Sequence, residues 1–290
     1  SIKIARAWGY KKKGIPQNEA INIFFNNNFW GRSIAACSSS NDPSCYNNFG
    51  PYTKGFTLLD YNNINQLEDY LRRTPNVASI MLEPIQGEGG IIVPNTGYLS
   101  KIRRLCNQYN VLMIVDEIQT GLGRTGKMLA CDYENVKPDL LCLGKALSGG
   151  FYPISAVLSN EEVMSVLTPG THGSTYGGNP MACALGIKAL EIIEKENLIN
   201  NAYEMGKYFR KNLKIDDYEI VKDIRGKGLL NGIEFYNAKD AEDFVELLLE
   251  ERILTKTTRE RVVRITPPLT INKKQIYNLI NKIKISLEKI

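Results

Sequence analysis

Short apolar runs alternate with helical stretches from about residue 20 to residue 160, and this alternation constrains the fold most. Each run is too short for a helix and is flanked by polar residues, Gly or Pro, as buried strands usually are. Amphipathic stretches such as 64–73 and 98–109 separate them. Strands with helices between them predict an α/β fold with a mainly parallel sheet covered on both faces. The predicted strands are residues 21–25, 78–84, 111–117, 139–144 and 154–159.

The pattern changes after residue 180, where long helices lead into strands that are joined by short turns. Strands paired in this way and backed by helices predict a separate, smaller α+β domain. We therefore assign residues 1–197 to a large domain and residues 198–290 to a small C-terminal domain. The elements predicted in this half are a helix at 181–199, a second helix after it, two strands within 218–235, a helix at 240–251, a short strand pair around 253–265 and a closing helix at 273–288.

Composition and charge exclude several classes of function. The chain is 43% hydrophobic and 23% charged, which are ordinary proportions for a globular protein. Its formal net charge of +5 is small, and its basic residues are scattered, so we expect no nucleic-acid-binding surface. No apolar stretch approaches the roughly 20 residues that a helix needs to cross a bilayer, so we expect no membrane role.

The six cysteines are dispersed, include no CxxC pair, and are accompanied by one histidine, His172. A structural zinc site needs clustered Cys or His ligands, so we expect no metal. This usage indicates a reducing compartment with mostly buried thiols, and we expect the cytoplasm rather than the mitochondrial matrix. The opening residues SIKIARAWGY have the spacing of the end of a helix, so we expect that the chain starts mid-fold and lacks an N-terminal part of the large domain.

Two predicted strands deliver reactive side chains to the same edge of the sheet. Asp116 ends the strand at 111–117, and Lys145 follows the strand at 139–144. Open α/β sheets bind ligands at the carboxyl ends of their strands. A desolvated lysine amine loses its proton more readily and can then attack a carbonyl group. The alternatives are that Asp116 caps a helix and that Lys145 is a surface residue or forms a salt bridge to Asp116.

A glycine pattern in the same region imitates a nucleotide site. Gly121, Gly123 and Gly126 fit GxGxxG, and residues 121–127 fit the opening of a phosphate-binding P-loop. The P-loop needs Ser or Thr after its Lys to hold magnesium, whereas this chain has Met128. A dinucleotide fingerprint follows its strand directly, whereas here four residues intervene. We therefore expect no nucleotide at this position.

Several segments, in their order along the chain, carry a resemblance to a known family. They are LEPIQGEGG (82–90), residues 111–126, residues 139–157 and THGSTYGGNP (171–180). Together they resemble the class III aminotransferases, which depend on pyridoxal 5'-phosphate (PLP) and have the PLP-dependent transferase fold type I. Other stretches resemble the ornithine aminotransferases of that family: FFNNNFWGR (24–32), DYENVKPD (132–139), GKALSGGFYPISAV (144–157), RGKGLLN (225–231) and RITPPL (264–269).

The resemblance implies how PLP would be bound. Lys145 would attach PLP covalently through its amine and later move a proton at the substrate carbon. Asp116 would pair with the pyridine nitrogen and keep it protonated, so that the ring can accept electrons. Gln119 would hydrogen-bond the phenolic oxygen of the ring, and Ile118 and Phe29 would pack on its two faces.

The resemblance also implies a homodimer with shared active sites. Ser174 and Thr175 lie in a glycine-flanked turn, where backbone and hydroxyl donors can meet phosphate oxygens. In the family this turn reaches the cofactor of the partner subunit. Further cofactor and substrate residues would lie upstream of Ser1.

Three residues would set the substrates, which the resemblance identifies as L-ornithine and 2-oxoglutarate. Arg32 would bind a carboxylate of 2-oxoglutarate through its planar guanidinium. Glu88 and Arg264 would form a switchable ion pair that masks Arg264 for ornithine and frees it for the α-carboxylate of the second acid. The alternative is a fixed structural salt bridge. The δ-amino group of ornithine would pass to 2-oxoglutarate, giving glutamate-5-semialdehyde, which cyclises to pyrroline-5-carboxylate, and glutamate.

Alternatives remain open for substrate and function. Another class III aminotransferase could act on acetylornithine or 4-aminobutyrate, and a catalytically silent relative could serve as a binding protein. Cys37 and Cys45 bracket the polar loop CSSSNDPSC, where we do not expect cysteines in ornithine aminotransferases generally. They could form a reversible disulfide that reshapes the substrate entrance, with a thiol-redox partner, or they could be two unrelated thiols.

Overall fold

The computed structural model describes residues 1–214 and 218–290, and contacts between residues divide it into two compact units. The first unit comprises residues 1–84, 94–119 and 131–189. The second comprises residues 85–93, 120–130 and 190–290. The division thus precedes the predicted boundary at residue 198, and two segments from the N-terminal half join the second unit.

The two segments belong to the second unit because their side chains pack against its residues and form hydrogen bonds with them. Ile85 and Ile91 form a buried cluster with Leu230. The Arg124 guanidinium donates hydrogen bonds to the backbone oxygens of Leu229, at 3.3 Å, and Pro267, at 2.5 Å. These partners lie more than 100 residues along the chain, so the local pattern of strands and helices does not reveal them.

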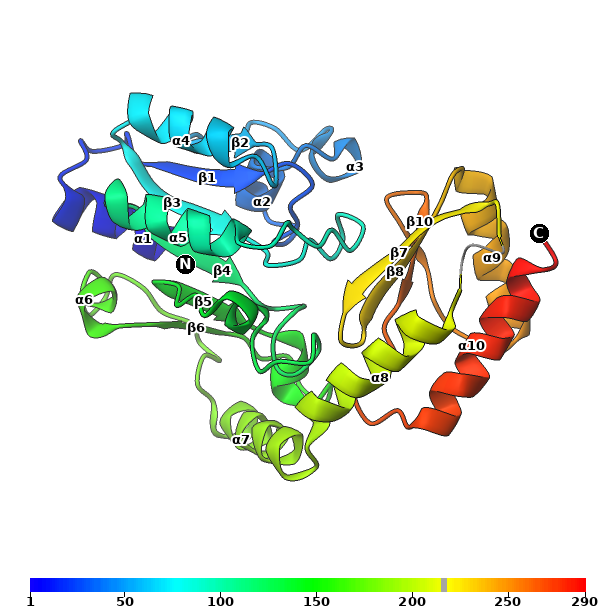
Figure 1. Ribbon diagram of the computed structural model, residues 1–290. Helices are drawn as coiled ribbons and strands as arrows, with labels where there is room; N and C mark the ends of the chain where they lie inside the picture. The colour runs from blue at the N-terminus through cyan, green and yellow to red at the C-terminus, as the bar shows by residue number, and fades with distance from the viewer. Residues whose placement is uncertain (215–217) are drawn as a thin grey trace. The chain divides into compact units, whose positions relative to one another are not determined.

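A six-stranded sheet forms the centre of the first unit (Figure 1). Its order is β2-β1-β3-β4-β5-β6, and every neighbouring pair is parallel except β5 and β6. The predicted mainly parallel α/β fold is therefore confirmed. The strands are β1 (Ile21–Phe25), β2 (Phe56–Leu59), β3 (Val77–Leu82), β4 (Leu112–Asp116), β5 (Leu140–Leu143) and β6 (Ala156–Ser159).

Helices cover both faces of this sheet because successive strand residues point to opposite sides. Phe24 of β1 joins a buried cluster with Ile4 and Trp8 of the N-terminal helix. The next residue, Phe25, places its ring 6.1 Å from that of Tyr98, on the opposite face. The helical segments are α1 (Ile2–Trp8), η1 (Gly9–Lys13), α2 (Ile34–Ser38), α3 (Pro43–Tyr46), α4 (Ile64–Arg73), α5 (Tyr98–Gln108), η2 (Ala130–Glu134), η3 (Lys145–Ser148), α6 (Glu161–Met164) and α7 (Pro180–Lys195).

The helix predicted at 181–199 and the second helix predicted after it are both present, but the first ends earlier, at Lys195. The structure has two helices there, α7 and α8 (Leu198–Asn212), with Asn197 between them. Asn197 has a φ of 51°, in the left-handed region that asparagine enters more readily than most residues. A left-handed residue cannot continue a right-handed helix, so the helix ends. No helix in the described residues is long and apolar enough to span a membrane.

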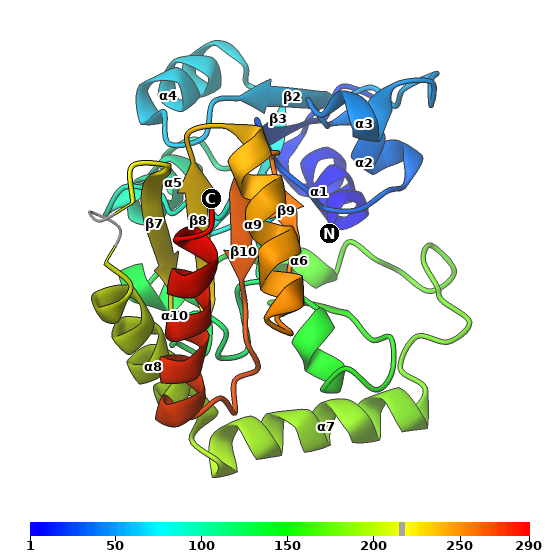
Figure 2. The ribbon, with the colours of Figure 1, turned by 90° about the vertical axis from the view of Figure 1, so that its right-hand side faces the viewer.

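The second unit contains an antiparallel sheet of order β7-β8-β10-β9 (Figure 2). One buried cluster joins one face of the sheet, through Ile233, Phe235 and Val263, to the three helices of the unit. The predicted α+β character is confirmed. The elements are α8, β7 (Val221–Lys227), β8 (Leu230–Phe235), α9 (Ala238–Glu250), β9 (Thr257–Thr258), β10 (Val262–Ile265) and α10 (Lys273–Leu287).

Residues 85–93, and not a helix, pack against the other face of this sheet. A Cβ built on Gly232 of β8 would lie 3.1 Å from Ile91 and 3.0 Å from Val262 of β10. A Cβ on Gly90 would lie 3.5 Å from Val262. The residues with even numbers on β8 and β10 therefore face this segment, which carries Glu88.

Candidate active site

Asp116 and Lys145 lie at the ends of neighbouring parallel strands. Asp116, the last residue of β4, pairs with Cys142 of β5. Lys145 follows β5 and opens η3, and its positive charge lowers the pKa of Asp116. The structure thus brings together the carboxylate and the amine that the sequence pattern assigned to one sheet edge.

Asp116 is a buried carboxyl group, with 6% of its surface exposed. Burial raises its pKa to about 6, although a hydrogen bond and the charge of Lys145 act in the opposite direction. That hydrogen bond is donated by the backbone N–H of Ile118 to Oδ1, at 3.0 Å. Turns follow β4 and the next helical segment begins only at Ala130, so Asp116 does not cap a helix. A carboxyl group with this pKa is mostly ionised at neutral pH, and a cation beside it would favour the ionised form further.

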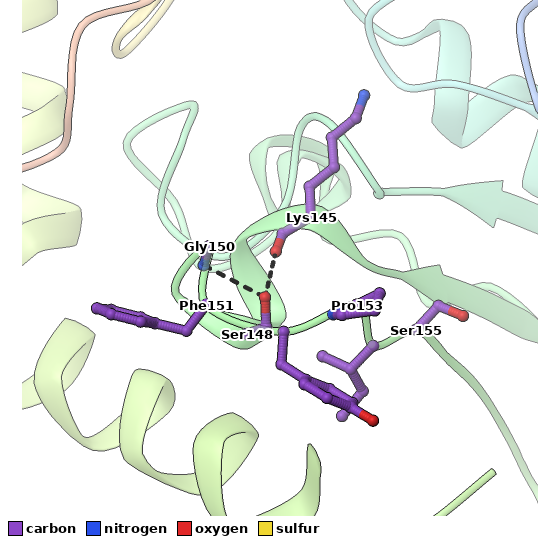
Figure 3. A pocket seen from close by; sticks show the side chains of 8 residues that line it. Lys145, Ser148, Gly150, Phe151, Pro153 and Ser155 are labelled. Atoms are coloured by element: carbon purple, nitrogen blue, oxygen red, sulfur yellow. Dashed lines mark hydrogen bonds between the residues drawn. The ribbon is translucent and has the colours of Figure 1, made fainter. Parts of the chain in front are cut away.

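Lys145 has an unusual backbone conformation, with a φ of 44°. A residue other than glycine rarely enters this left-handed region, and such strain concentrates at functional sites. Its side chain is exposed, and Figure 3 shows it extending away from residues 148–155. Ser148 supports the turn, because its Oγ donates to the Lys145 oxygen at 3.4 Å and accepts from Gly150 N at 3.2 Å. Ser148 was not among the predicted site residues, and its only signal in the sequence is that it is a polar residue three positions after Lys145.

A cavity of about 570 Å³ lies beside this turn. The Lys145 amine points away from the other residues of the cavity lining (Figure 3), so this is not the space into which the amine extends. The cavity borders an exposed apolar surface, in which Phe151 is 86% exposed. Its lining consists of Lys145, Ser148, Gly150, Phe151, Tyr152, Pro153, Ile154 and Ser155.

Phe29 and Arg32 follow β1, and Glu83 follows the neighbouring parallel strand β3 at the same edge of the sheet. Phe29 donates its backbone N–H to Oε1 of Glu83, the residue after β3, at 3.1 Å. The Arg32 guanidinium carbon lies 5.4 Å from the centre of the Phe29 ring, within cation–π range. The structure therefore places Phe29 and Arg32 together.

The remaining predicted cofactor residues fall into two groups. Ile118 and Gln119 are half-buried directly after β4, and a Cβ on Gly144 would lie 3.4 Å from the Ile118 side chain. Ser174 and Thr175 are instead exposed in a turn. The Ser174 hydroxyl accepts a hydrogen bond from the N–H of Gly177 at 3.1 Å.

In the second unit, Glu88 and Arg264 form an ion pair. Arg264 Nη1 lies 2.5 Å from Glu88 Oε1, and the two side chains are 19% and 25% exposed. Glu88 has a further cation that the sequence analysis missed, since Lys256 Nζ lies 3.5 Å from Oε2. Lys256 could have been found from the sequence by its position in the strand pair predicted around 253–265, opposite Arg264.

Cys37 of α2 and Cys45 of α3 are buried, and both have free thiols. The sulfur of Cys37 faces the backbone oxygen of Arg32 at 3.9 Å, and that of Cys45 lies 4.0 Å from Ser44 Oγ. Across residues 1–214 and 218–290, no group of three or more His, Cys, Asp or Glu side chains could hold a metal ion.

The family model for aminotransferase class-III matches residues 1–287. The chain therefore belongs to the class III aminotransferases, a family of enzymes that use PLP. It is similar to the mitochondrial ornithine aminotransferase of Drosophila melanogaster, with 52% identity over 284 residues. The match covers 98% of this chain and 66% of the fly protein, so the chain spans just under two thirds of that relative's length.

Solved structures give the same family. An ornithine aminotransferase from Toxoplasma gondii ME49 matches with a TM-score of 0.97 and 50% identity, covering 99% of this chain and 69% of that one. An acetylornithine aminotransferase from Elizabethkingia anophelis matches with a TM-score of 0.88 and 40% identity, covering 100% and 70%. The predicted fold type is confirmed by these neighbours, whereas enzymes of both substrate classes share it.

Proposed function

We propose that this chain carries the catalytic residues of an ornithine δ-aminotransferase. The enzyme would move the δ-amino group of L-ornithine to 2-oxoglutarate, giving glutamate-5-semialdehyde, which cyclises to pyrroline-5-carboxylate, and glutamate. The observation that carries the choice of substrates is the Glu88–Arg264 ion pair, because one pocket must accept a cationic amino acid and a dicarboxylate in turn. The identity to ornithine aminotransferases supports the same choice.

The residues at the β4–β5 edge suit PLP by their chemistry. A lysine amine can attach to its aldehyde, and a buried carboxylate can hold the proton on its ring nitrogen. When bound, PLP supplies an electron sink for a carbanion at the substrate carbon. Lys145 would both hold the cofactor and move the proton at that carbon, and its side chain is exposed.

Asp116 would keep the ring nitrogen protonated, since burial makes an unpaired charge costly for this carboxylate and favours a cationic partner. Gln119 would hydrogen-bond the phenolic oxygen of the ring. Ile118 and Phe29 would pack on its two faces.

Glu88, Arg264 and Arg32 would select the two substrates. With the ion pair closed, Arg264 is neutralised, and ornithine presents its δ-amine. With the pair open, Arg264 binds the α-carboxylate of 2-oxoglutarate. Arg32 would bind the other carboxylate, for which its exposed guanidinium is suited.

The partner subunit would complete each site. Ser174 and Thr175 are exposed, as phosphate ligands of a neighbouring subunit would be before assembly. The same unit exposes Phe151, Tyr176, Met181 and Ile187, by 60% or more of each residue's surface. Exposed apolar residues in this number favour burial against another protein surface, which we propose to be a second copy of the same protein.

The competing assignment is an aminotransferase for acetylornithine or 4-aminobutyrate. Values of kcat/KM for these two donors and ornithine, measured on the full-length protein, separate the three. We expect ornithine to exceed both others by at least about tenfold, in line with the identity to ornithine aminotransferases. A preference for acetylornithine would reject the assignment.

The second candidate is a silent relative that binds ligands without catalysis. The presence of both Lys145 and Asp116 at one sheet edge argues against it. Full-length protein should turn yellow with PLP, and borohydride should bleach the colour and fix the cofactor on Lys145. A colourless protein after PLP addition would support the silent relative.

Cys37 and Cys45 would form a reversible disulfide near Arg32, because the sulfur of Cys37 already faces the backbone oxygen of Arg32. The buried free thiols also fit a reducing compartment, and we propose the cytoplasm. Mass spectrometry of oxidised full-length protein tests the disulfide. Two free thiols together with unchanged activity would eliminate it and any role for a thiol-redox partner.

A further inference from the structure

Lys256, the residue before β9, lies opposite Arg264 of β10, so two like charges face each other. Thr257 of β9 pairs with Val263 of β10, and Arg264 donates its backbone N–H to the Lys256 oxygen at 3.3 Å. Like charges in this position repel each other. The Glu88 carboxylate contacts both, with Oε1 2.5 Å from Arg264 and Oε2 3.5 Å from Lys256. One anion therefore holds two cations together.

The two contacts of Glu88 differ in strength. The Arg264 side chain is 19% exposed and makes the short contact. The Lys256 side chain is 61% exposed and makes the longer one, at the end of a flexible stem. Arg264 is thus the main partner of Glu88, and Lys256 is a second partner at the other oxygen of the same carboxylate.

The backbone around Glu88 is fixed, so only its side chain needs to move between these cations. Thr258 Oγ1 donates a hydrogen bond to the backbone oxygen of Glu88 at 2.7 Å. The Arg225 guanidinium donates hydrogen bonds to the backbone oxygens of Gly90, at 2.6 Å, and Ile91, at 3.0 Å. Thr258 of β9 and Lys256, two residues earlier, both contact Glu88, as expected for side chains that alternate along an extended backbone.

We propose that Lys256 is a positioning residue that receives the Glu88 carboxylate when Arg264 is released to bind substrate. The inference rests on the proposed opening of the Glu88–Arg264 pair. Opening that pair separates a carboxylate that is only 25% exposed from its arginine, which is less unfavourable where a second cation can receive it. With Lys256 at hand, Glu88 stays paired in both states. Lys256 therefore stabilises the open state, which 2-oxoglutarate needs, and adds nothing that ornithine needs.

The test is the Lys256→Met variant of the full-length enzyme, which keeps the apolar stem and removes the charge. We expect kcat/KM for 2-oxoglutarate to fall about two- to fivefold, the range of an exposed ion pair, while kcat/KM for ornithine stays unchanged. Lys256→Arg should restore the wild-type value. The control is Lys239→Met, which removes another exposed lysine of the same unit, paired with Asp243 on α9. A Lys256→Met variant that matches this control would overturn the proposal.

A double-mutant cycle with Glu88→Gln separates action through Glu88 from direct attraction of the dicarboxylate. If Lys256 acts through Glu88, Lys256→Met should have no further effect on 2-oxoglutarate in the Glu88→Gln background. An equal loss in both backgrounds would overturn the proposal, because Lys256 would then attract the substrate itself. Wild-type enzyme that fails to use ornithine would instead refute the proposed function, and the inference with it.

Discussion

At the scale of single residues, Asp116 and Lys145 both occupy states that the isolated chain would avoid. Asp116 is a buried carboxyl group, and the backbone of Lys145 is in the left-handed conformation. Features of this kind lower stability and persist where another requirement keeps them. Here the requirement is a carboxylate and an amine at one sheet edge.

The first prediction concerns Asp116→Asn. Burial raises the folded-state pKa of Asp116 from 3.8 to about 6, so its ionised form destabilises the fold as pH rises through that interval. Without PLP, the variant should be more stable than wild type at pH 8 by about 3 kcal/mol, and the difference should vanish near pH 4. Its kcat should nevertheless fall by about 10²–10³.

Urea denaturation of the cofactor-free proteins at several pH values measures the effect of Asp116→Asn. The matched control is Asp69→Asn, which neutralises an exposed carboxylate of α4. A stability difference for Asp116→Asn that does not depend on pH would contradict the account of its burial.

At the scale of elements, the sequence predicted the strands that carry the site and missed the features set by one residue or by distant partners. The apolar runs before Asp116 and Lys145 sufficed for β4 and β5. The edge strand β2 was missed because three half-buried residues and one buried residue leave no clear pattern. The break between α7 and α8 was placed a few residues too late, because its position depends on the backbone of Asn197.

The break gives the second prediction. Asn197→Ala should lower the free energy of unfolding by about 1–2 kcal/mol, because a Cβ without a compensating side chain disfavours the left-handed conformation. Asn197→Gly should stay close to wild type, since glycine adopts that conformation freely. Urea denaturation of the three proteins measures this, and kcat should be the same in all of them. Equal loss in both variants would show that the Asn197 side chain, and not its backbone, is what matters.

At the scale of the whole molecule, the candidate site depends on contacts that no local pattern contains. The resemblance named Glu88 and Arg264 as a pair, but only the structure shows Lys256 at the same carboxylate. It also shows that Glu88 belongs to the second unit, although its segment follows a strand of the first. Packing of Ile85 and Ile91 against Leu230 decides this, and that packing is a long-range event.

The third prediction concerns assembly. In full-length protein, Phe151→Glu should yield monomers and reduce activity at least about tenfold, because an unpaired charge buried in an apolar interface costs several kcal/mol. Light scattering and steady-state rates measure the two effects. Leu249→Glu, at a 58% exposed position on α9, is the control and should remain dimeric. A Phe151→Glu variant that stays dimeric and active would remove this surface from the interface.

The passage of the chain between the two units also has a consequence for synthesis on the ribosome. The chain passes from one unit to the other after Pro84, Val93, Gln119, Ala130 and Ala189, so neither unit is one continuous stretch. Glu88 is made 176 residues before Arg264. A nascent chain therefore contains Asp116 and Lys145 long before Glu88 can pair with Arg264, so under the proposed function the pair that selects substrates is the last to form.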